Sequence, residues 1–87
     1  MYKYILLYDT DCMQCKYVLA KFKHSNIEDK IQFYVKDSKE FNAYKTLYKI
    51  QKVPIIFIFK DKELLYNKIL DKKDDIDWCI DFIYIHS

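Results

Sequence analysis

Residues 4–15 decide the fold, and they read Tyr-Ile-Leu-Leu-Tyr-Asp-Thr-Asp-Cys-Met-Gln-Cys. The first five are apolar and rich in strand formers, which is the pattern of a β-strand buried on both faces. A polar loop follows, and Asp11 or Cys12 is placed to cap a helix that starts inside the motif and ends by His24 to Asn26. Two cysteines three residues apart on a first helical turn can close a disulfide and reopen it. The stretch therefore predicts a redox-active dithiol between a strand and a helix.

The composition indicates one small domain spanning residues 1–87. Hydrophobic residues make up 52% of the chain and aromatic residues 18%, so burial of apolar surface is expected to suffice for folding. Three cysteines are an odd count, whereas a secreted disulfide scaffold of this length more often carries an even set of four or more. We therefore expect a reducing, cytoplasmic location.

The charge pattern and the N-terminal residues exclude two classes of partner at the level of sequence. The net charge of +2 comes from lysines scattered among Asp and Glu, without the basic cluster that a nucleic-acid surface needs. The apolar run at residues 4–8 is too short for a signal peptide or a membrane span. We expect a monomer that binds neither nucleic acid nor membrane.

The middle of the chain predicts a second strand and a second helix. Residues 31–35 alternate and are rich in β-branched and aromatic side chains, which favours a strand. Asp37 and Glu40, three apart, can form a capping box that starts a helix, and this helix should end before Pro54. Its predicted apolar face contains Phe41, Tyr44, Leu47 and Tyr48.

The last third predicts a hairpin and a final helix. Residues 55–59 are five apolar residues in a row, which indicates a central strand covered on both faces. A turn without glycine at 60–63 leads into an antiparallel edge strand at 64–70. Carboxylates within residues 71–75 favour the start of a helix. The apolar side of this helix contains Ile76, Cys79, Ile80 and Ile83, widened by Trp78, Phe82 and Ile85. The order β-α-β-α-β-β-α predicts a small α/β fold of two or three layers.

The element order, the Cys-x-x-Cys position and a lone proline before the third strand resemble the thioredoxin fold in its minimal form. The likeness is most particular in residues 48–63, where Tyr-x-Ile-x-x-Val-Pro leads into a strand and a Lys-Asp-Lys-Glu turn. In length the chain resembles glutaredoxins and the short glutaredoxin-like thioredoxins. The resemblance implies a four-stranded mixed sheet flanked by three helices. It also implies that Pro54 is a cis-proline beside the sulfurs, which leaves Val53 backbone groups open to a substrate strand.

The chain also departs from the family. The motif is Cys-Met-Gln-Cys, and Asp11 stands where thioredoxins place a tryptophan. Leu6 occupies the position of the buried aspartate that accepts a proton from the second cysteine in thioredoxins. Lys52 stands where glutaredoxins prefer threonine, and their glutathione-binding Gly-Gly-x-x-Asp stretch is not found before the last helix.

The two cysteines are expected to play different roles. Thiol-disulfide exchange needs a thiolate, and unpaired N–H groups at a helix N-terminus stabilise one, so Cys12 is the predicted nucleophile. Lys16, one turn further, is expected to support that thiolate, while Asp9 and Asp11 oppose it. Cys15 is the predicted resolving thiol. The predicted substrate contacts are Val53, Pro54, Met13, Gln14 and Tyr8, although Tyr8 fits a core position equally well.

Cys12 and Cys15 could instead be half of a zinc site or two unconnected core cysteines. A zinc site would need two more ligands, and Cys79, His24 and His86 lack paired spacing, so we expect neither a metal nor a bound cofactor. Cys79 has core spacing and is expected to be inert.

The sequence therefore predicts a thiol-disulfide oxidoreductase that acts on protein disulfides and is reduced by thioredoxin reductase or glutathione. The alternatives are a glutathione-dependent glutaredoxin and a binding module of the same fold without redox turnover.

Overall fold

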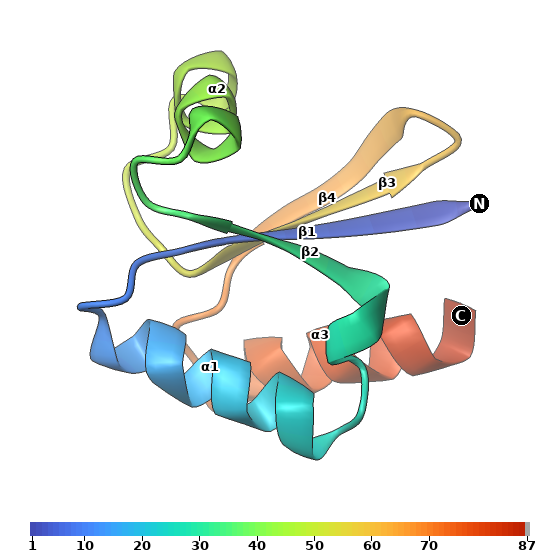
Figure 1. Cartoon of the computed structure of the whole chain (residues 1–87). Coiled ribbons are helices and arrows are strands. Elements are labelled where there is room, and N and C mark those ends of the chain that lie inside the picture. The colour runs from blue at the N-terminus through green and yellow to red at the C-terminus, as the bar shows by residue number, and fades with distance from the viewer. Residues whose placement is uncertain (87) are drawn as a thin grey trace.

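The computed structural model describes residues 1–86 and confirms the predicted order of helices and strands (Figure 1). One short 3-10 turn, η1, was not predicted from the sequence. The elements are β1 (Tyr2–Tyr8), α1 (Met13–His24), η1 (Glu28–Lys30), β2 (Ile31–Val35), α2 (Lys39–Tyr48), β3 (Ile55–Lys60), β4 (Glu63–Ile69) and α3 (Lys73–His86).

The four strands form one mixed sheet in the order β2-β1-β3-β4. β1 pairs in parallel with β2 and antiparallel with β3, and β3 pairs antiparallel with β4. The two most apolar strands, β1 and β3, are therefore central, as their sequences predict, and β4 is an edge strand. The β3–β4 register shifts between Ile58 and Phe59.

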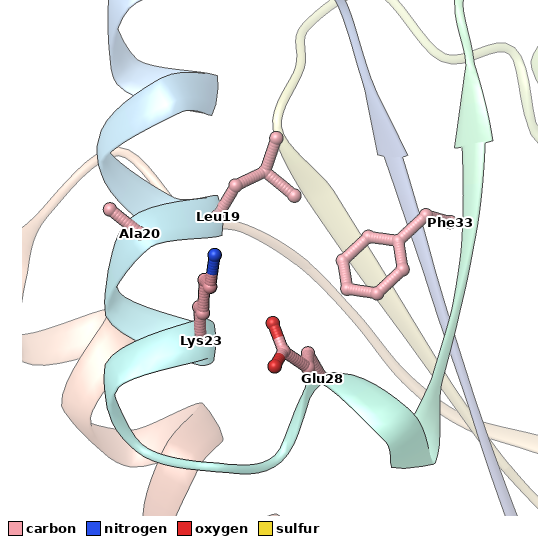
Figure 2. Close-up of a pocket in the computed structure, with 5 residues that line it drawn as sticks. All are labelled: Leu19, Ala20, Lys23, Glu28 and Phe33. Carbon is pink, nitrogen blue, oxygen red and sulfur yellow. The ribbon is translucent and has the colours of Figure 1, made fainter.

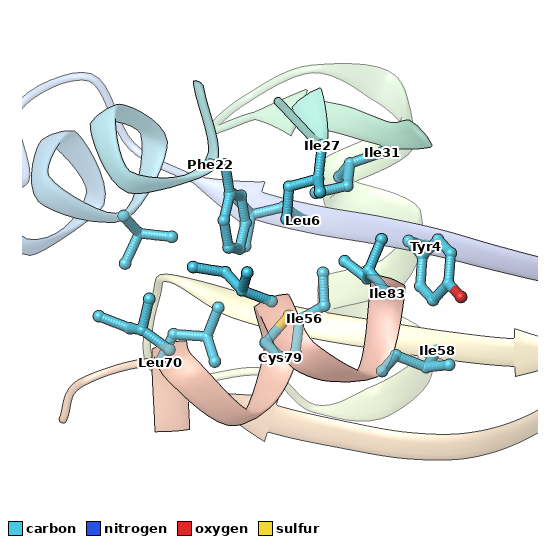
Figure 3. Packing of buried hydrophobic residues seen from close by; sticks show 13 residues of the cluster. Tyr4, Leu6, Phe22, Ile27, Ile31, Ile56, Ile58, Leu70, Cys79 and Ile83 are labelled. Carbon is cyan, nitrogen blue, oxygen red and sulfur yellow. The ribbon is translucent and has the colours of Figure 1, made fainter. Parts of the chain in front are cut away.

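The sheet has a hydrophobic cluster on each face, which makes the fold a three-layer one. α1 and α3 cover one face and α2 covers the other (Figure 1). Alternation along β1 sends Tyr4 and Leu6 to the first face and Ile5 and Leu7 to the second. Figure 3 shows the larger cluster, in which side chains of α1 and α3 pack against β1 and β3. This packing holds the N-terminus of α1, and with it the Cys-x-x-Cys motif, at one end of the sheet.

The predicted Asp37–Glu40 capping box is wrong, because Ser38 caps α2. The backbone of Ser38 is extended, with φ −70° and ψ 159°, and its Oγ accepts a hydrogen bond from the Phe41 N–H at 3.1 Å. Asp37 lies one residue too early and adopts a left-handed conformation with φ 71°. Asp tolerates that conformation, so Asp37 serves the turn instead of the helix.

Two predicted core positions are exposed. Leu47 is 72% exposed and Ile85 is 76% exposed. At about 100° of rotation per helical residue, Ile85 lies on the side of α3 opposite Ile76, and Leu47 lies about 90° from the centre of the buried face of α2. The sequence pattern therefore predicts a wider apolar face on α2 and on α3 than the sheet covers.

The chain turns without glycine by placing other residues in the left-handed region. Asp61 and Lys62, with φ 51° and 74°, form the predicted turn between β3 and β4. Lys49, with φ 54°, ends α2, and its N–H donates to the carbonyl of Lys45. The chain then runs through residues 50–53 toward Pro54.

Candidate functional site

The first cysteine of the motif caps α1 with its own sulfur. Cys12 has an extended backbone, and its Sγ accepts a hydrogen bond from the Cys15 N–H at 3.0 Å. This contact directs an unpaired N–H of the first helical turn at the sulfur, which is how a helix N-terminus stabilises a thiolate. The sequence left the cap open between Asp11 and Cys12, and the structure assigns it to Cys12.

The two sulfurs of the motif differ in exposure, and burial changes the proton affinity of Cys15. Cys12 is partly exposed, whereas Cys15 is fully buried, and both are free thiols. Burial raises the pKa of the Cys15 thiol to about 12, and its contact with the Cys12 sulfur acts in the same direction. The Asp9 N–H, 3.5 Å from the Cys15 Sγ, lowers this pKa in part. At neutral pH, Cys15 therefore keeps its proton, and Cys12 is the sulfur that solvent can reach.

Asp9 and Lys36 join the site through the parallel pairing of β1 and β2. The Lys36 N–H donates to the Tyr8 carbonyl at 2.8 Å, which brings the ends of the two strands together. The Lys36 Nζ lies 3.7 Å from Asp9 Oδ2, while Asp9 Oδ1 accepts the Asp11 N–H at 3.1 Å. The negative charge beside the cysteines is thus partly balanced. Sequence reasoning missed Lys36, although an in-register parallel pairing of the two predicted strands would have placed it there.

The segment before β3 lies at the same end of the sheet as the cysteines. The Val53–Pro54 peptide bond is cis, as the family resemblance implies. Ile55 pairs with Leu7, so Pro54 lies beside the end of β1. Pro54 is buried and Val53 is partly buried.

The side chain of Gln14 connects α1 to this segment. Its Nε2 donates to the Leu70 carbonyl at 3.0 Å, and the Leu70 N–H donates to the Pro54 carbonyl at 2.9 Å. Leu70, just beyond β4, thereby links the first turn of α1 to the cis-proline. The sequence offered no signal for Leu70, because both contacts are long-range. Gln14, which the sequence placed among the substrate contacts, has its amide nitrogen directed at the protein interior.

We expect Gln14→Ala to lower the free energy of unfolding by about 1 kcal/mol, because a partly buried carbonyl loses its donor. Urea denaturation would measure the change. Gln51→Ala is the matched control, because Gln51 is exposed and makes no side-chain hydrogen bond within residues 1–86. Equal effects of the two substitutions would contradict this role of Gln14.

The other predicted site residues differ in accessibility. Met13 is 78% exposed beside the sulfurs, and Lys16 is also exposed. Tyr8 is partly buried, with its ring edge-to-face against Phe33 at a centroid distance of 6.3 Å. Leu6 is fully buried in the larger cluster, and no polar or charged side chain is buried within residues 1–86. The described part of the chain therefore holds no buried carboxylate for Cys15.

Cys79 lies in the hydrophobic core and not in the site. It is fully buried on α3, and Figure 3 shows it among apolar side chains that include Ile56 and Leu70. Burial raises the pKa of its thiol to about 12. Within the described residues, no three His, Cys, Asp or Glu side chains gather closely enough to hold a metal ion.

The two buried thiols predict a loss of stability in alkaline solution. Their folded pKa values, about 12, lie above the ordinary value of 9.0, so the unfolded chain releases these protons first as the pH rises. Their contribution is complete below about pH 9 and is lost between about pH 9 and 12. We expect the urea midpoint of the reduced protein to fall between pH 7 and pH 10, and to fall less in Cys79→Ala. The same fall in both proteins would contradict the assignment to Cys79.

A hollow elsewhere on the surface is not part of the site. It lies between α1 and the η1–β2 segment and is lined by Leu19, Ala20, Lys23, Glu28 and Phe33 (Figure 2). None of these five residues carries a thiol, and Lys23 and Glu28 lie toward the end of α1 remote from Cys12. This hollow adds nothing to the chemistry of the motif.

Comparison with solved structures identifies the fold. Thioredoxin f from spinach chloroplast, in its short form, superposes with a TM-score of 0.70 and 19% identity over 95% of this chain and 76% of that chain. Fasciola hepatica thioredoxin superposes with a TM-score of 0.69 and 12% identity over 93% of this chain and 79% of that chain. Thioredoxin f2, in a complex with ferredoxin:thioredoxin reductase, superposes with a TM-score of 0.70 and 18% identity over 95% of this chain and 77% of that chain. A scan of protein-family models and a search of curated proteins give no match.

These superpositions show that the chain has a thioredoxin-like fold. They confirm the fold class that the sequence predicts, a four-stranded mixed sheet flanked by three helices. None of the helices within residues 1–86 is long and apolar enough to cross a membrane.

Proposed function

We propose that this protein is a thiol-disulfide oxidoreductase that reduces disulfides in other proteins. The observation that carries the proposal is the inequality of the two sulfurs at the start of α1. Cys12 is accessible and receives a helix N–H, whereas Cys15 is buried, protonated and in contact with the Cys12 sulfur. One thiol is placed to attack a disulfide from outside, and the other to act only after the first has captured a partner.

The reaction consists of two exchanges. The Cys12 thiolate attacks one sulfur of the substrate disulfide, forms a mixed disulfide with it and releases the other sulfur as a thiolate, which takes a proton from water. Cys15 then gives its proton to water and attacks the Cys12 sulfur, which releases the second substrate thiol. The products are a reduced substrate and a Cys12–Cys15 disulfide, and two electrons have passed from the protein to the substrate.

Substrate contacts in this proposal come from the same end of the sheet. An extended substrate segment would pair with the backbone of Val53, beside Pro54, while exposed Met13 and partly buried Tyr8 offer apolar contacts. Lys16 would support the thiolate by its charge. Gln14 would act indirectly, by holding the start of α1 against Leu70.

An upstream reductant must return the two electrons. A solved thioredoxin f2 is in complex with ferredoxin:thioredoxin reductase, which supports a reductase as the class of donor. Thioredoxin reductase or glutathione would serve, with no bound cofactor in this chain. The proposal also includes a monomer in a reducing, cytoplasmic compartment.

One observation favours a second candidate, a binding module without turnover. Leu6 is apolar and fully buried, and Cys15, with its raised pKa, has no buried carboxylate within residues 1–86 to take its proton. Slow resolution would leave captured partners bound. The chain would then act as a docking subunit that retains the fold.

Insulin-disulfide reduction tests these readings. With dithiothreitol as reductant, the oxidoreductase should accelerate insulin precipitation at catalytic concentrations of protein. Absence of turnover would overturn the proposal, and a mixed disulfide that accumulates at Cys12 would then favour the binding module. A parallel assay with glutathione and a glutathione mixed disulfide identifies the glutaredoxin alternative, since only that enzyme requires glutathione.

A further inference from the structure

A lysine-rich surface adjoins the site on the side of Val53. Three neighbouring hollows share Ile50 and Gln51, and the one nearest the motif, of about 200 Å³, is also lined by Asp9 and Val53. The lysines that line the three hollows come from the residue after β2, from α2 and its C-cap, from the loop before Pro54 and from β4. We call them the lysine surface, and they are Lys36, Lys45, Lys49, Lys52 and Lys68.

This surface is more basic than the protein as a whole. Among the described residues that line the three hollows, Asp9 is the only one with a carboxylate, whereas the whole chain has a net charge of only +2. The remainder of the chain must therefore carry more acidic than basic groups. The positive potential is concentrated beside the motif, where it can draw in charged ligands.

Part of this charge has no ion-pair partner within residues 1–86. Lys36 lies 3.7 Å from Asp9, and Lys68 lies 3.6 Å from Asp75. Within residues 1–86, no ion pair involves Lys45, Lys49 or Lys52, and all three are exposed. These three ammonium groups are available to carboxylates from outside.

The lysine surface lies next to the backbone of Val53, where a substrate segment would pair. Asp9 lines the nearest hollow, and its N–H lies 3.5 Å from the Cys15 sulfur. Val53 lines the same hollow, at the point where a substrate segment would pair with the backbone. The lining also includes the apolar side chains of Phe41 and Ile50, so the carboxylates of a substrate bound at the lysines would lie next to apolar surface. A polypeptide whose cysteine reaches Cys12 along Val53 would therefore lie next to Lys45 and Lys52.

We propose that the lysine surface selects disulfide substrates in which acidic residues flank the attacked cysteine. The inference rests on the proposed function and specifies its substrate class. The occupant is an extended acidic polypeptide segment, because the adjacent sulfur acts on cysteine disulfides. Opposite charges would raise the rate of encounter, and salt would screen the effect.

The experiment compares two peptides in single-turnover reactions with the reduced protein. Each carries one cysteine in mixed disulfide with the same chromophoric thiol, and they differ only in having glutamate or glutamine on both sides of the cysteine. At low ionic strength, the glutamate peptide should react about tenfold faster, and in 1 M salt the ratio should fall to about two or less.

A matched pair of variants locates the effect. Lys45→Gln/Lys52→Gln should bring the rate ratio close to one at low salt, whereas Lys23→Gln/Lys62→Gln should keep it. Lys23 lines the separate hollow of Figure 2, and Lys62 lies in the β3–β4 turn, so neither belongs to the lysine surface. Equal rates for the two peptides, or equal effects of the two double variants, would overturn the charge selection and leave the oxidoreductase proposal intact. Failure of both peptides to react would contradict the oxidoreductase proposal itself.

Discussion

Replacing Cys12 with serine is expected to lower the rate of insulin reduction by about 1,000-fold or more, to the rate of the reductant alone. A hydroxyl stays protonated at neutral pH and is a poor nucleophile toward sulfur. Cys15 cannot substitute, because it is fully buried and burial raises its pKa to about 12. The loss should appear in turnover and not in folding, because Cys12 is a partly exposed cap at the edge of the core.

Two further substitutions control this result. Cys79→Ala should keep turnover within about twofold, because the Cys79 sulfur lies among core side chains away from the motif. Cys15→Ser, mixed with insulin in the absence of dithiothreitol, should capture the substrate but fail to release it. Dithiothreitol added afterwards should reduce the accumulated mixed disulfide. Turnover by Cys12→Ser above the rate of the reductant alone would show that another group attacks, and the assignment of the nucleophile would be wrong.

Local patterns were sufficient to predict most of the fold and the cysteines of the site. Apolar runs identified both central strands, and the lone proline marked the start of β3 within one residue. The position of Cys12 at the start of a helix also follows from neighbouring residues alone. These features depend on contacts between residues close in sequence, for which spacing and residue type carry the information.

The contacts that complete the site depend on tertiary register. Gln14 reaches Leu70 across 56 residues of sequence, and Lys36 reaches Asp9 only after two parallel strands pair. Residue type does not encode such distances. The same limit explains the error at Leu47, since an apolar residue on a helix becomes buried only if the sheet extends beneath it. Sequence reasoning thus found the sulfurs and named Asp9 and Gln14 beside them, but it missed their partners Lys36 and Leu70.

Phe57→Ala is expected to lower the free energy of unfolding by about 3–5 kcal/mol, as for other buried aromatic residues. Phe57 is fully buried on β3, in the smaller cluster beneath α2. Its ring centroid lies 5.3 Å from that of Tyr44 and 5.0 Å from that of Tyr48, so the substitution would leave a cavity beneath these two rings of α2. Since small domains have total stabilities of about 5–15 kcal/mol, the variant should be close to unfolding. Urea denaturation at neutral pH would measure the change.

Leu47→Ala is the control for this prediction, because it removes an apolar side chain from the same helix at a position that is 72% exposed. We expect it to change stability by less than about 0.5 kcal/mol. A loss at Leu47 comparable to that at Phe57 would mean that α2 packs through a wider face than the structure shows. α1 lies on the opposite face of the sheet, so the Phe57→Ala molecules that remain folded should still react with iodoacetamide at Cys12 at the wild-type rate. A slower reaction would instead indicate that the cluster under α2 also positions the cysteines, through the loop that leads from α2 to Pro54.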